Sequence, residues 1–166
     1  MAETPEGLLA RLAAAGIAAE TRHHPPVFTV AESRALRGEL PGGHTKNLFL
    51  KPAKGEGPYL LATLEEERQV SVNALARLAG AGKVTMAGAD ELVAVLGVPP
   101  GSVTPFGLVN AAPGQVRFAI DRHLAEGFGR IWVHPLTNAA STGIAPADLL
   151  RFLEGCGHPA MLLDLG

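Results

Sequence analysis

The segment that decides the fold is Gly43–Leu50, with the sequence GHTKNLFL. Its apolar half, Leu48–Leu50, is followed by a turn rich in glycine and proline and then by a second apolar run, Tyr59–Thr63. Two such runs joined by a few turn-forming residues predict a β-hairpin with a loop of several residues. Lys46 and Asn47 stand at the predicted entrance to a buried strand, where polar side chains call for an explanation.

The rest of the chain interleaves helices and short strands. Capping residues, proline positions and apolar spacing predict helices over residues 5–15, 29–38, 72–78, 89–96 and 146–154. Strands are predicted over 83–86, 116–120, 130–134 and 160–165, with an irregular acidic turn between 120 and 130. Hairpins imply antiparallel pairing and helical connections imply some parallel pairing. We therefore expect an α+β fold: a single compact domain over residues 1–166, with a mixed, curved sheet surrounded by helices.

Composition narrows the classes of function. With 47% apolar and 18% charged residues among 166, the chain is predicted to fold rather than to be disordered. Its single cysteine, Cys156, excludes an internal disulfide and a multi-cysteine zinc site, and favours a reducing, cytoplasmic setting. Neither a secretory signal nor a run of about 18 uncharged apolar residues is present, so no membrane span is expected. The net charge of −2 argues against a general nucleic-acid or DNA binder, although residues 1–54 hold seven Lys/Arg against five Asp/Glu.

Lys46 is the first residue that could carry chemistry. A lysine is costly to bury, but at the entrance to an apolar strand its ammonium group can point into a cleft while its stem packs along the wall. The alternative is a surface lysine on an edge strand, where the charge discourages aggregation through the sheet. Asn47 beside it is also explained by turn chemistry. The residues alone leave both interpretations open.

A second candidate is the stretch Gly97–Gly107, with the sequence GVPPGSVTPFG. This density of glycine and proline predicts a rigid loop, whose backbone N–H groups can bind a carbonyl oxygen or a developing oxyanion without reorganising. A purely structural, Ω-like connection is the alternative. Its other residues are small or apolar, which suits the wall of a tight pocket.

His134, which follows the apolar run Ile131–Val133, is the third candidate. A histidine can transfer a proton near neutral pH or hold a neighbouring group in place, but a lone histidine at a strand end is also commonly structural. Asn138, Ser141 and Thr142 add neutral hydrogen-bonding groups nearby without a clear nucleophile.

Other chemistries find little support. The chain has no phosphate-binding Gly-Lys-Ser/Thr loop, dinucleotide fingerprint or Gly-X-Ser-X-Gly elbow. His23 and His24 are adjacent, so in an extended segment they point to opposite faces and would chelate one metal poorly. We expect neither a metal ion nor a cofactor.

Three segments in order carry a family resemblance: GGHTKNLFLK (42–51), VPPGSVTPFGLVN (98–110) and WVHPLTNAASTGI (132–144). Together they resemble the freestanding prolyl-tRNA editing family, the YbaK/ProX-like domains, and matching segments extend from about residue 24 to the C-terminal strand. The segment SVTPFGLVN is most similar to the corresponding segment of the branch that deacylates alanyl-tRNA(Pro). The resemblance implies the fold of the prolyl-tRNA-synthetase-associated editing domain, with a barrel-like sheet. It also implies a trans-acting hydrolase that cleaves the ester joining a wrong amino acid to tRNA(Pro).

The resemblance also implies roles for individual residues. Lys46 would be the essential catalytic residue at the reacting end of the substrate, and no cofactor is implied. Substrate-binding roles would fall on Asn47, Gly101, Ser102, Val103, Thr104, Pro105, Phe106, His134 and Asn138. The loop Gly101–Pro105 would hold the aminoacyl group, with Val103, Pro105 and Phe106 as candidates for a sieve that excludes proline. We expect the Lys46 ammonium group and this loop to face each other across one small cavity, in which water attacks with help from a ribose hydroxyl of the substrate.

The implied partner is mischarged tRNA(Pro), contacted through its aminoacylated CCA end, with prolyl-tRNA synthetase as a further transient partner. A single-stranded RNA end can be recognised through its bases and 2′-hydroxyl groups. Alanine, serine, cysteine and 2-aminobutyrate all remain open as the amino acid that is removed. A non-catalytic module of the same fold that binds aminoacyl-tRNA, and a different esterase that uses Cys156 or a serine, are the alternatives.

Overall fold

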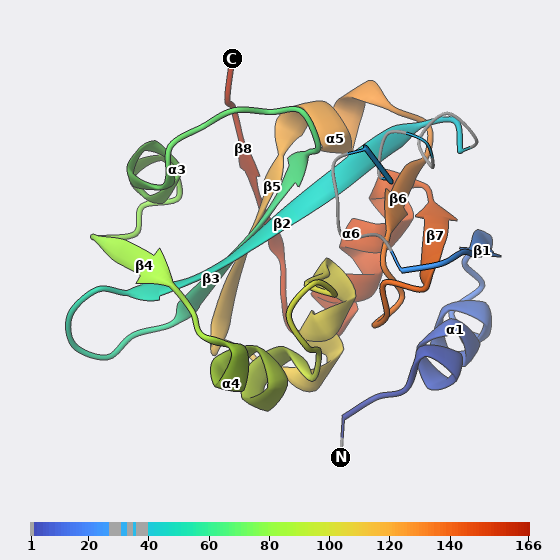
Figure 1. Ribbon diagram of the computed structural model, residues 1–166, viewed down its shortest axis with the longest axis horizontal. Coiled ribbons are helices and arrows are strands. Elements are labelled where there is room, and N and C mark those ends of the chain that lie inside the picture. Colours follow the sequence, from blue (N-terminus) through green and yellow to red (C-terminus); the bar gives the residue numbers. More distant parts are fainter. Residues whose placement is uncertain (1, 27–30, 33–34, 36–39) are drawn as a thin grey trace.

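The computed structural model describes residues 2–26, 31–32, 35 and 40–166, and its centre is one eight-stranded mixed sheet (Figure 1). The strands are β1 (Ala19–His23), β2 (Gly43–Pro52), β3 (Tyr59–Glu65), β4 (Val84–Met86), β5 (Val116–Asp121), β6 (Ile131–Val133), β7 (Ala140–Ile144) and β8 (Ala160–Leu163). The helices are α1 (Pro5–Ala14), α3 (Val72–Leu78), α4 (Ala89–Glu91), α5 (Arg122–Gly127) and α6 (Pro146–Gly155), with a π-helical turn η1 (Leu92–Leu96) and a 3-10 helix η2 (Pro105–Asn110). The predicted helix over 29–38 falls mostly on residues outside this described part.

The order of strands in the sheet is β1-β7-β6-β2-β3-β5-β8, and β4 also pairs with β2. β2 and β3 form the predicted antiparallel hairpin, with Leu50 opposite Leu60. β3 runs parallel to β5, β5 runs parallel to β8, and β2 runs parallel to β6. Parallel and antiparallel pairing in one sheet, with helices around it, confirms the α+β prediction.

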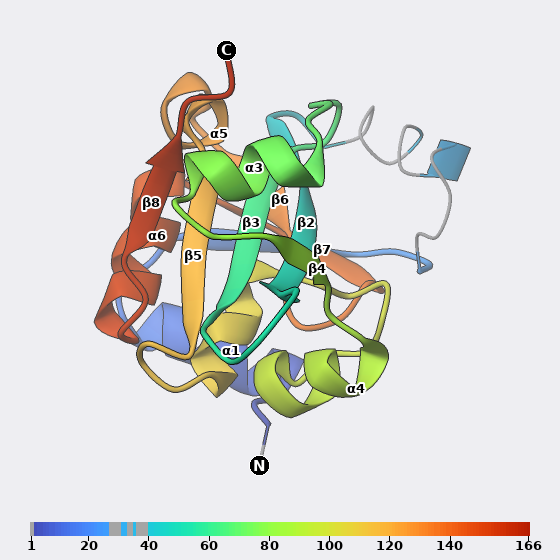
Figure 2. The same cartoon turned by 90° about the vertical axis from the view of Figure 1, so that its left-hand side faces the viewer.

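The alternation of side chains along each strand divides the interior into two cores. Phe49 and Phe118 belong to the larger core, which also receives α1, α6 and the inner faces of β6 and β7. Leu50 and Leu60 face the other way and pack with Leu75 of α3 in a smaller core. Figure 2 shows α3 lying over this second face of β3 and β5. The sheet is therefore covered on both faces, and neighbouring residues of β2 point into different cores.

Two strands and one helix differ from the sequence prediction. β7 has the sequence ASTGI, whose small and polar residues show no apolar alternation, yet it is buried throughout between β1 and β6. β1 was missed because its five residues are mostly exposed or half-buried and polar. The predicted acidic turn after residue 120 is the helix α5, which begins where the Asp121 carboxylate accepts a hydrogen bond from His123 N at 3.0 Å. With six residues, α5 is too short to show a helical period.

A charged cluster fastens the end of the β2–β3 hairpin to the start of α4. Glu91 accepts hydrogen bonds from Lys51 Nζ at 2.8 Å, Tyr59 Oη at 2.9 Å and Gly88 N at 3.1 Å. The hydrogen bond from Lys51 contributes most, followed by those from Gly88 and Tyr59, and together they lower the pKa of Glu91 to about 2. The same contacts raise the pKa of Lys51 and of Tyr59 above their usual values.

The change Glu91→Gln should lower the Tm by about 2 °C at neutral pH, because a charge-assisted cluster at a partly exposed site contributes modestly. A carboxyl group whose pKa is depressed by folding stabilises the protein above its ordinary pKa of 4.5 and loses that contribution as the pH falls toward 2. The Tm difference between the wild type and Glu91→Gln should therefore shrink over this range in thermal unfolding scans. Asp90→Asn, at an exposed neighbour, is the control and should leave the Tm unchanged at every pH. A Tm difference independent of pH would contradict the prediction.

Candidate functional site

The candidate site lies at an interruption in the pairing of β2. Along one edge, β2 pairs with β3 from Thr45 to Leu50. Along the other edge it pairs with β6 at Gly43–His44 and with β4 only from Leu50 onward. On that second edge, no strand of the described chain pairs with Thr45–Leu48, the open edge. Unpaired strand edges present backbone and side-chain groups to whatever lies alongside them.

The open edge is bridged by side chains. Thr45 Oγ1 donates to the carbonyl oxygen of Trp132 at 2.8 Å. Asn47 Nδ2 donates to the carbonyl oxygen of Val103 at 3.2 Å, while Asn47 Oδ1 accepts from Thr63 Oγ1 at 2.6 Å. Asn47 thus connects the β2–β3 hairpin to the Gly101–Pro105 loop, which is the second predicted segment.

The Gly101–Pro105 loop is in turn fastened to His134. Thr104, which is fully buried, donates from Oγ1 to the carbonyl oxygen of His134 at 2.6 Å and accepts from Phe106 N at 3.2 Å. Phe106 is also fully buried, with its ring packed edge-on against Phe152 in the larger core. The loop is therefore anchored at Thr104 and Phe106. The N–H groups of Gly101 and Val103 donate to no described residue.

His134 is half-buried at the end of β6 and its protonation state follows from its surroundings. Burial lowers the pKa of His134 below its usual value, and the nearby His24 lowers it further, against the opposing hydrogen bond to Ala140. Nδ1 lies 3.1 Å from the carbonyl oxygen of Ala140, which can only accept, so Nδ1 carries the proton. The neutral ring therefore keeps a lone pair on Nε2, as a general base or a hydrogen-bond acceptor requires.

Lys46 lies on the opposite face of β2 from Asn47. Its partner across the hairpin is Leu64, a residue of the smaller core, and its ammonium group donates to the carbonyl oxygen of Arg68. Because β2 begins at Gly43, Lys46 is inside the strand and not at its entrance. The structure thus brings Asn47, the Gly101–Pro105 loop and His134 together, but it does not place the Lys46 ammonium group against that loop.

The carbonyl oxygen of Arg68 accepts the hydrogen bond from Lys46, and the side chain of Arg68 is bound by a buried carboxylate. Asp121, with a side-chain exposure of 1%, accepts hydrogen bonds from Arg68 Nε at 3.1 Å and from Arg68 Nη2 at 3.2 Å. The same carboxylate accepts from the N–H groups of Glu65 and His123. The paired Asp121 carboxylate raises the pKa of the Arg68 guanidinium. Four donors satisfy this buried charge and fix the segment that follows β3.

The remaining candidates are less connected. Ser102 is buried in the loop, and Asn138 is half-buried in the turn between β6 and β7. Cys156 lies after α6, where its sulfur receives a weak hydrogen bond from Arg11 at 3.7 Å. Among the residues that the structure describes, no three or more His, Cys, Asp or Glu side chains are arranged to hold a metal ion. Within the same part of the chain, no helix has both the length and the apolar character needed to cross a bilayer.

Three contacts near the candidate site were not predicted from the sequence, and only one of them has a sequence signal. Thr63 is a polar residue inside an apolar strand, and this was a usable sign of a buried hydrogen bond to Asn47. His24 and Ser141 are far apart in the chain, yet His24 Nε2 lies 2.9 Å from Ser141 Oγ beside the His134 region. The Arg68–Asp121 pair likewise depends on tertiary contacts and has no local pattern.

Comparisons with known proteins place the chain in a family. Residues 24–152 match the family described as the aminoacyl-tRNA editing domain. The chain belongs to this family. The match includes β2, the Gly101–Pro105 loop and His134, and so covers all three segments that meet at the site.

Two relatives are similar to this chain over most of their own lengths. The prolyl-tRNA synthetase associated domain-containing protein 1 of Bos taurus is 40% identical over 166 residues, covering 98% of this chain and 96% of the relative. The prolyl-tRNA editing protein ProX of Acetoanaerobium sticklandii is 30% identical over 142 residues, covering 86% and 85%. A solved structure described as a candidate trans-editing enzyme for prolyl-tRNA synthetase superposes with a TM-score of 0.73 at 21% identity, over 100% of this chain and 99% of that one. The structural likeness confirms the predicted editing-domain fold.

The change Asp121→Asn should destabilise the protein by about 3 kcal/mol, because it leaves the guanidinium of Arg68 without its charged partner and adds an amide donor among four donors. Urea unfolding measures this as a lower midpoint at unchanged slope. Asp90→Asn, at an exposed position on α4, is the matched control and should change the free energy of unfolding by less than about 0.5 kcal/mol. Equal effects of the two changes would show that the buried pair is not a stabilising contact.

Proposed function

We propose that this protein is a trans-acting editing hydrolase that cleaves the ester of alanyl-tRNA(Pro) and releases alanine and free tRNA(Pro). The observation that carries the proposal is the linkage of Asn47, the Gly101–Pro105 loop and His134 into one site. These residues belong to the matched editing domain, and they combine neutral polar groups with a rigid apolar wall. We also propose that residues 1–166 act as one editing domain.

The chemistry follows from the groups at the site. The N–H groups of Gly101 and Val103 are suited to stabilise the oxygen that becomes negatively charged when the ester carbonyl is attacked. Nε2 of neutral His134 accepts a hydrogen bond from the attacking water or from the ribose hydroxyl of the substrate. No protein nucleophile is needed, because water forms the new bond to the carbonyl carbon and the 3′-oxygen of the tRNA leaves with a proton.

Selectivity rests on size. A synthetase pocket shaped for proline cannot exclude alanine, since loss of a methylene contact discriminates by only about 1–3 kcal/mol. A second pocket that admits a methyl group and rejects a pyrrolidine ring corrects the error. Val103 and Pro105 line the anchored loop, and Phe106 fixes its position from within the core. Serine, cysteine and 2-aminobutyrate differ from alanine by few atoms, so they are the nearest competing substrates.

Lys46 is the proposed catalytic residue, and its position suggests how it acts. A ligand that lies against the open edge can be reached by side chains from both faces of β2, from Asn47 on one and from Lys46 on the other. The lysine stem is long and flexible, and one hydrogen bond to the Arg68 carbonyl oxygen is easily exchanged for a substrate oxygen or phosphate. Lys46 would thereby supply positive charge at the RNA end of the ester.

A binding module that captures aminoacyl-tRNA without hydrolysis is the second candidate. The hydrogen bond that occupies the Lys46 ammonium group favours it, because this contact holds the charge away from the loop. Tight binding of misacylated tRNA with no deacylation across the substrate panel described next would identify this function.

The change Lys46→Ala should lower kcat/KM for deacylation of alanyl-tRNA(Pro) by about 100-fold or more, with a Tm within about 2 °C of the wild type. Lys46→Met, which keeps most of the stem, separates loss of charge from loss of packing and should be equally inactive. Arg151→Ala, at an exposed position on α6, is the control and should retain full activity. The panel should include seryl-, cysteinyl-, 2-aminobutyryl- and prolyl-tRNA(Pro). Hydrolysis of alanyl- and prolyl-tRNA(Pro) at the same near-background rate would reject the proposal.

The rate of deacylation should also depend on the protonation of His134. Because burial lowers the pKa of His134, the fall in kcat/KM that accompanies protonation of this ring should lie at a more acidic pH than for an ordinary histidine. His134→Gln should lower the rate at neutral pH and remove the acidic fall in the pH profile. A fall that is unchanged in His134→Gln would assign the titration to another group.

A further inference from the structure

The tip of the β2–β3 hairpin and the turn before β4 enclose a hollow of about 460 Å³. A neighbouring hollow of about 350 Å³ shares the wall Ala81–Lys83. The charged residues that line the two hollows are Lys54, Arg77, Lys83 and Arg117, against the single acid Glu56. We call the two adjoining hollows, together with the four cationic side chains that line them, the basic hollow. In a chain of net charge −2, it is a strong local excess of positive charge.

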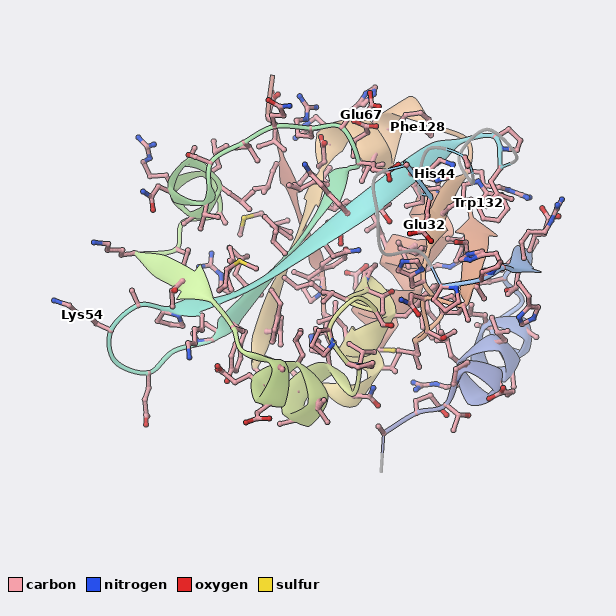
Figure 3. All side chains as sticks on the ribbon, in the orientation of Figure 1. Glu32, His44, Lys54, Glu67, Phe128 and Trp132 are labelled. Carbon is pink, nitrogen blue, oxygen red and sulfur yellow. The ribbon has the colours of Figure 1, made fainter. Side chains whose placement is uncertain are left out.

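The backbone holds these cations in a defined arrangement. Ala53 N donates to the carbonyl oxygen of Lys83 at 2.9 Å, which joins the segments that carry Lys54 and Lys83. Arg117, which is half-buried on β5, donates from Nη2 to the carbonyl oxygen of Ala79, and this anchors its guanidinium in the wall. Lys54 projects outward from the hairpin tip (Figure 3). The N–H groups of these four side chains that make no hydrogen bond to the described residues face solvent or the hollow.

The basic hollow is suited to phosphate groups. The turn in its wall contains Gly82, where an added Cβ would meet nothing within 4 Å, so an extended backbone can approach closely. Among the residues that the structure describes, no aromatic side chain lines either hollow, so unpaired bases find no ring there on which to stack. Several cations without aromatic rings are typical of surfaces that contact the sugar-phosphate backbone and not the bases.

The basic hollow lies on the same face of β2 as Lys46. Leu50 and Pro52 line it, and residues 46, 48, 50 and 52 of a strand share one face. At about 3.3 Å per residue, Lys46 and Pro52 are about 20 Å apart along β2. This is the length of a few base pairs of a duplex.

We propose that the basic hollow binds backbone phosphates of the tRNA acceptor stem while the aminoacyl end lies at the open edge of β2. This inference rests on the proposed function, since it takes tRNA as the ligand of the open edge. Affinity for the stem then comes from Lys54, Arg77, Lys83 and Arg117, and chemistry comes from residues about 20 Å away. The contact is to phosphates, so it is independent of the sequence of the stem.

The test uses single charge reversals in the full-length protein. Lys54→Glu and Lys83→Glu are compared with Arg151→Glu, which reverses one exposed positive charge on α6. Binding of fluorescently labelled, uncharged tRNA(Pro) is measured by anisotropy at several salt concentrations. Deacylation is measured with alanyl-tRNA(Pro) and with a short alanylated oligonucleotide that ends in CCA and lacks the stem.

Each hollow variant should weaken tRNA binding about tenfold and lower the slope of log affinity against log salt by about 1. Each should also lower kcat/KM for alanyl-tRNA(Pro) by a similar factor, with the short oligonucleotide hydrolysed as by the wild type. Arg151→Glu should leave all of these values unchanged. Unchanged tRNA binding by both hollow variants, or an equal loss with Arg151→Glu, would overturn the inference.

The binding arm separates this inference from the proposed function. If the wild type hydrolyses neither substrate but the hollow variants lose tRNA affinity, the proposed function fails and the phosphate site stands. If hydrolysis is normal and the hollow variants bind tRNA as tightly as the wild type, the proposed function stands and the phosphate site is overturned. Loss of binding to prolyl-tRNA synthetase with tRNA binding intact would assign the hollow to a protein partner and overturn the inference.

Discussion

The alternation of side chains along β2 is the constraint on which the rest of the structure depends. This strand joins the two parts of the sheet, since it pairs with β6 at its start, with β3 along its length and with β4 at its end. Period-two geometry then sends Asn47 toward the larger core and Lys46 toward the smaller one. The change of partner strand leaves the open edge, which contains both residues. A shift of register by one residue would exchange the two faces and remove the hydrogen bonds of Asn47.

Two polar side chains, the half-buried Asn47 and the buried Asp121, limit which local conformations are possible around this strand. Asn47 satisfies its amide with Thr63 and Val103, and Asp121 satisfies its charge with four donors from Arg68, Glu65 and His123. A buried polar group without partners is costly, so each of these residues selects the arrangement that provides them. The two networks therefore position the site without contributing a nucleophile, and their main effect is to hold the loop and the segment after β3 in one geometry.

The sequence predicts the parts of this protein that have a local pattern. The hairpin, the helices α1, α3 and α6, and the α+β class follow from apolar spacing, capping residues and proline positions. β7 could not be predicted because its residues are small and polar, and its burial is imposed by β1 and β6. The motifs select segments that the structure links by hydrogen bonds, but the face on which Lys46 lies depends on where β2 begins, which only the pairing with β6 fixes. The Arg68–Asp121 pair likewise arises from contacts between residues 53 positions apart in the chain.

Under the proposed function, the separation of charge from chemistry would allow a chain of net charge −2 to act on RNA. At the open edge the groups are mostly neutral: an asparagine amide, backbone N–H groups and a histidine whose burial favours the neutral ring. Such groups discriminate by shape and hydrogen bonding, which a size-selecting pocket requires. Cations gathered instead at the far end of β2 provide attraction that is long-ranged and insensitive to sequence. A uniformly basic surface would bind RNA at many places, whereas a localised one favours the orientation that delivers the aminoacyl end to the loop. Under the proposed function, the same strand would support both recognition of the stem and selection of the amino acid.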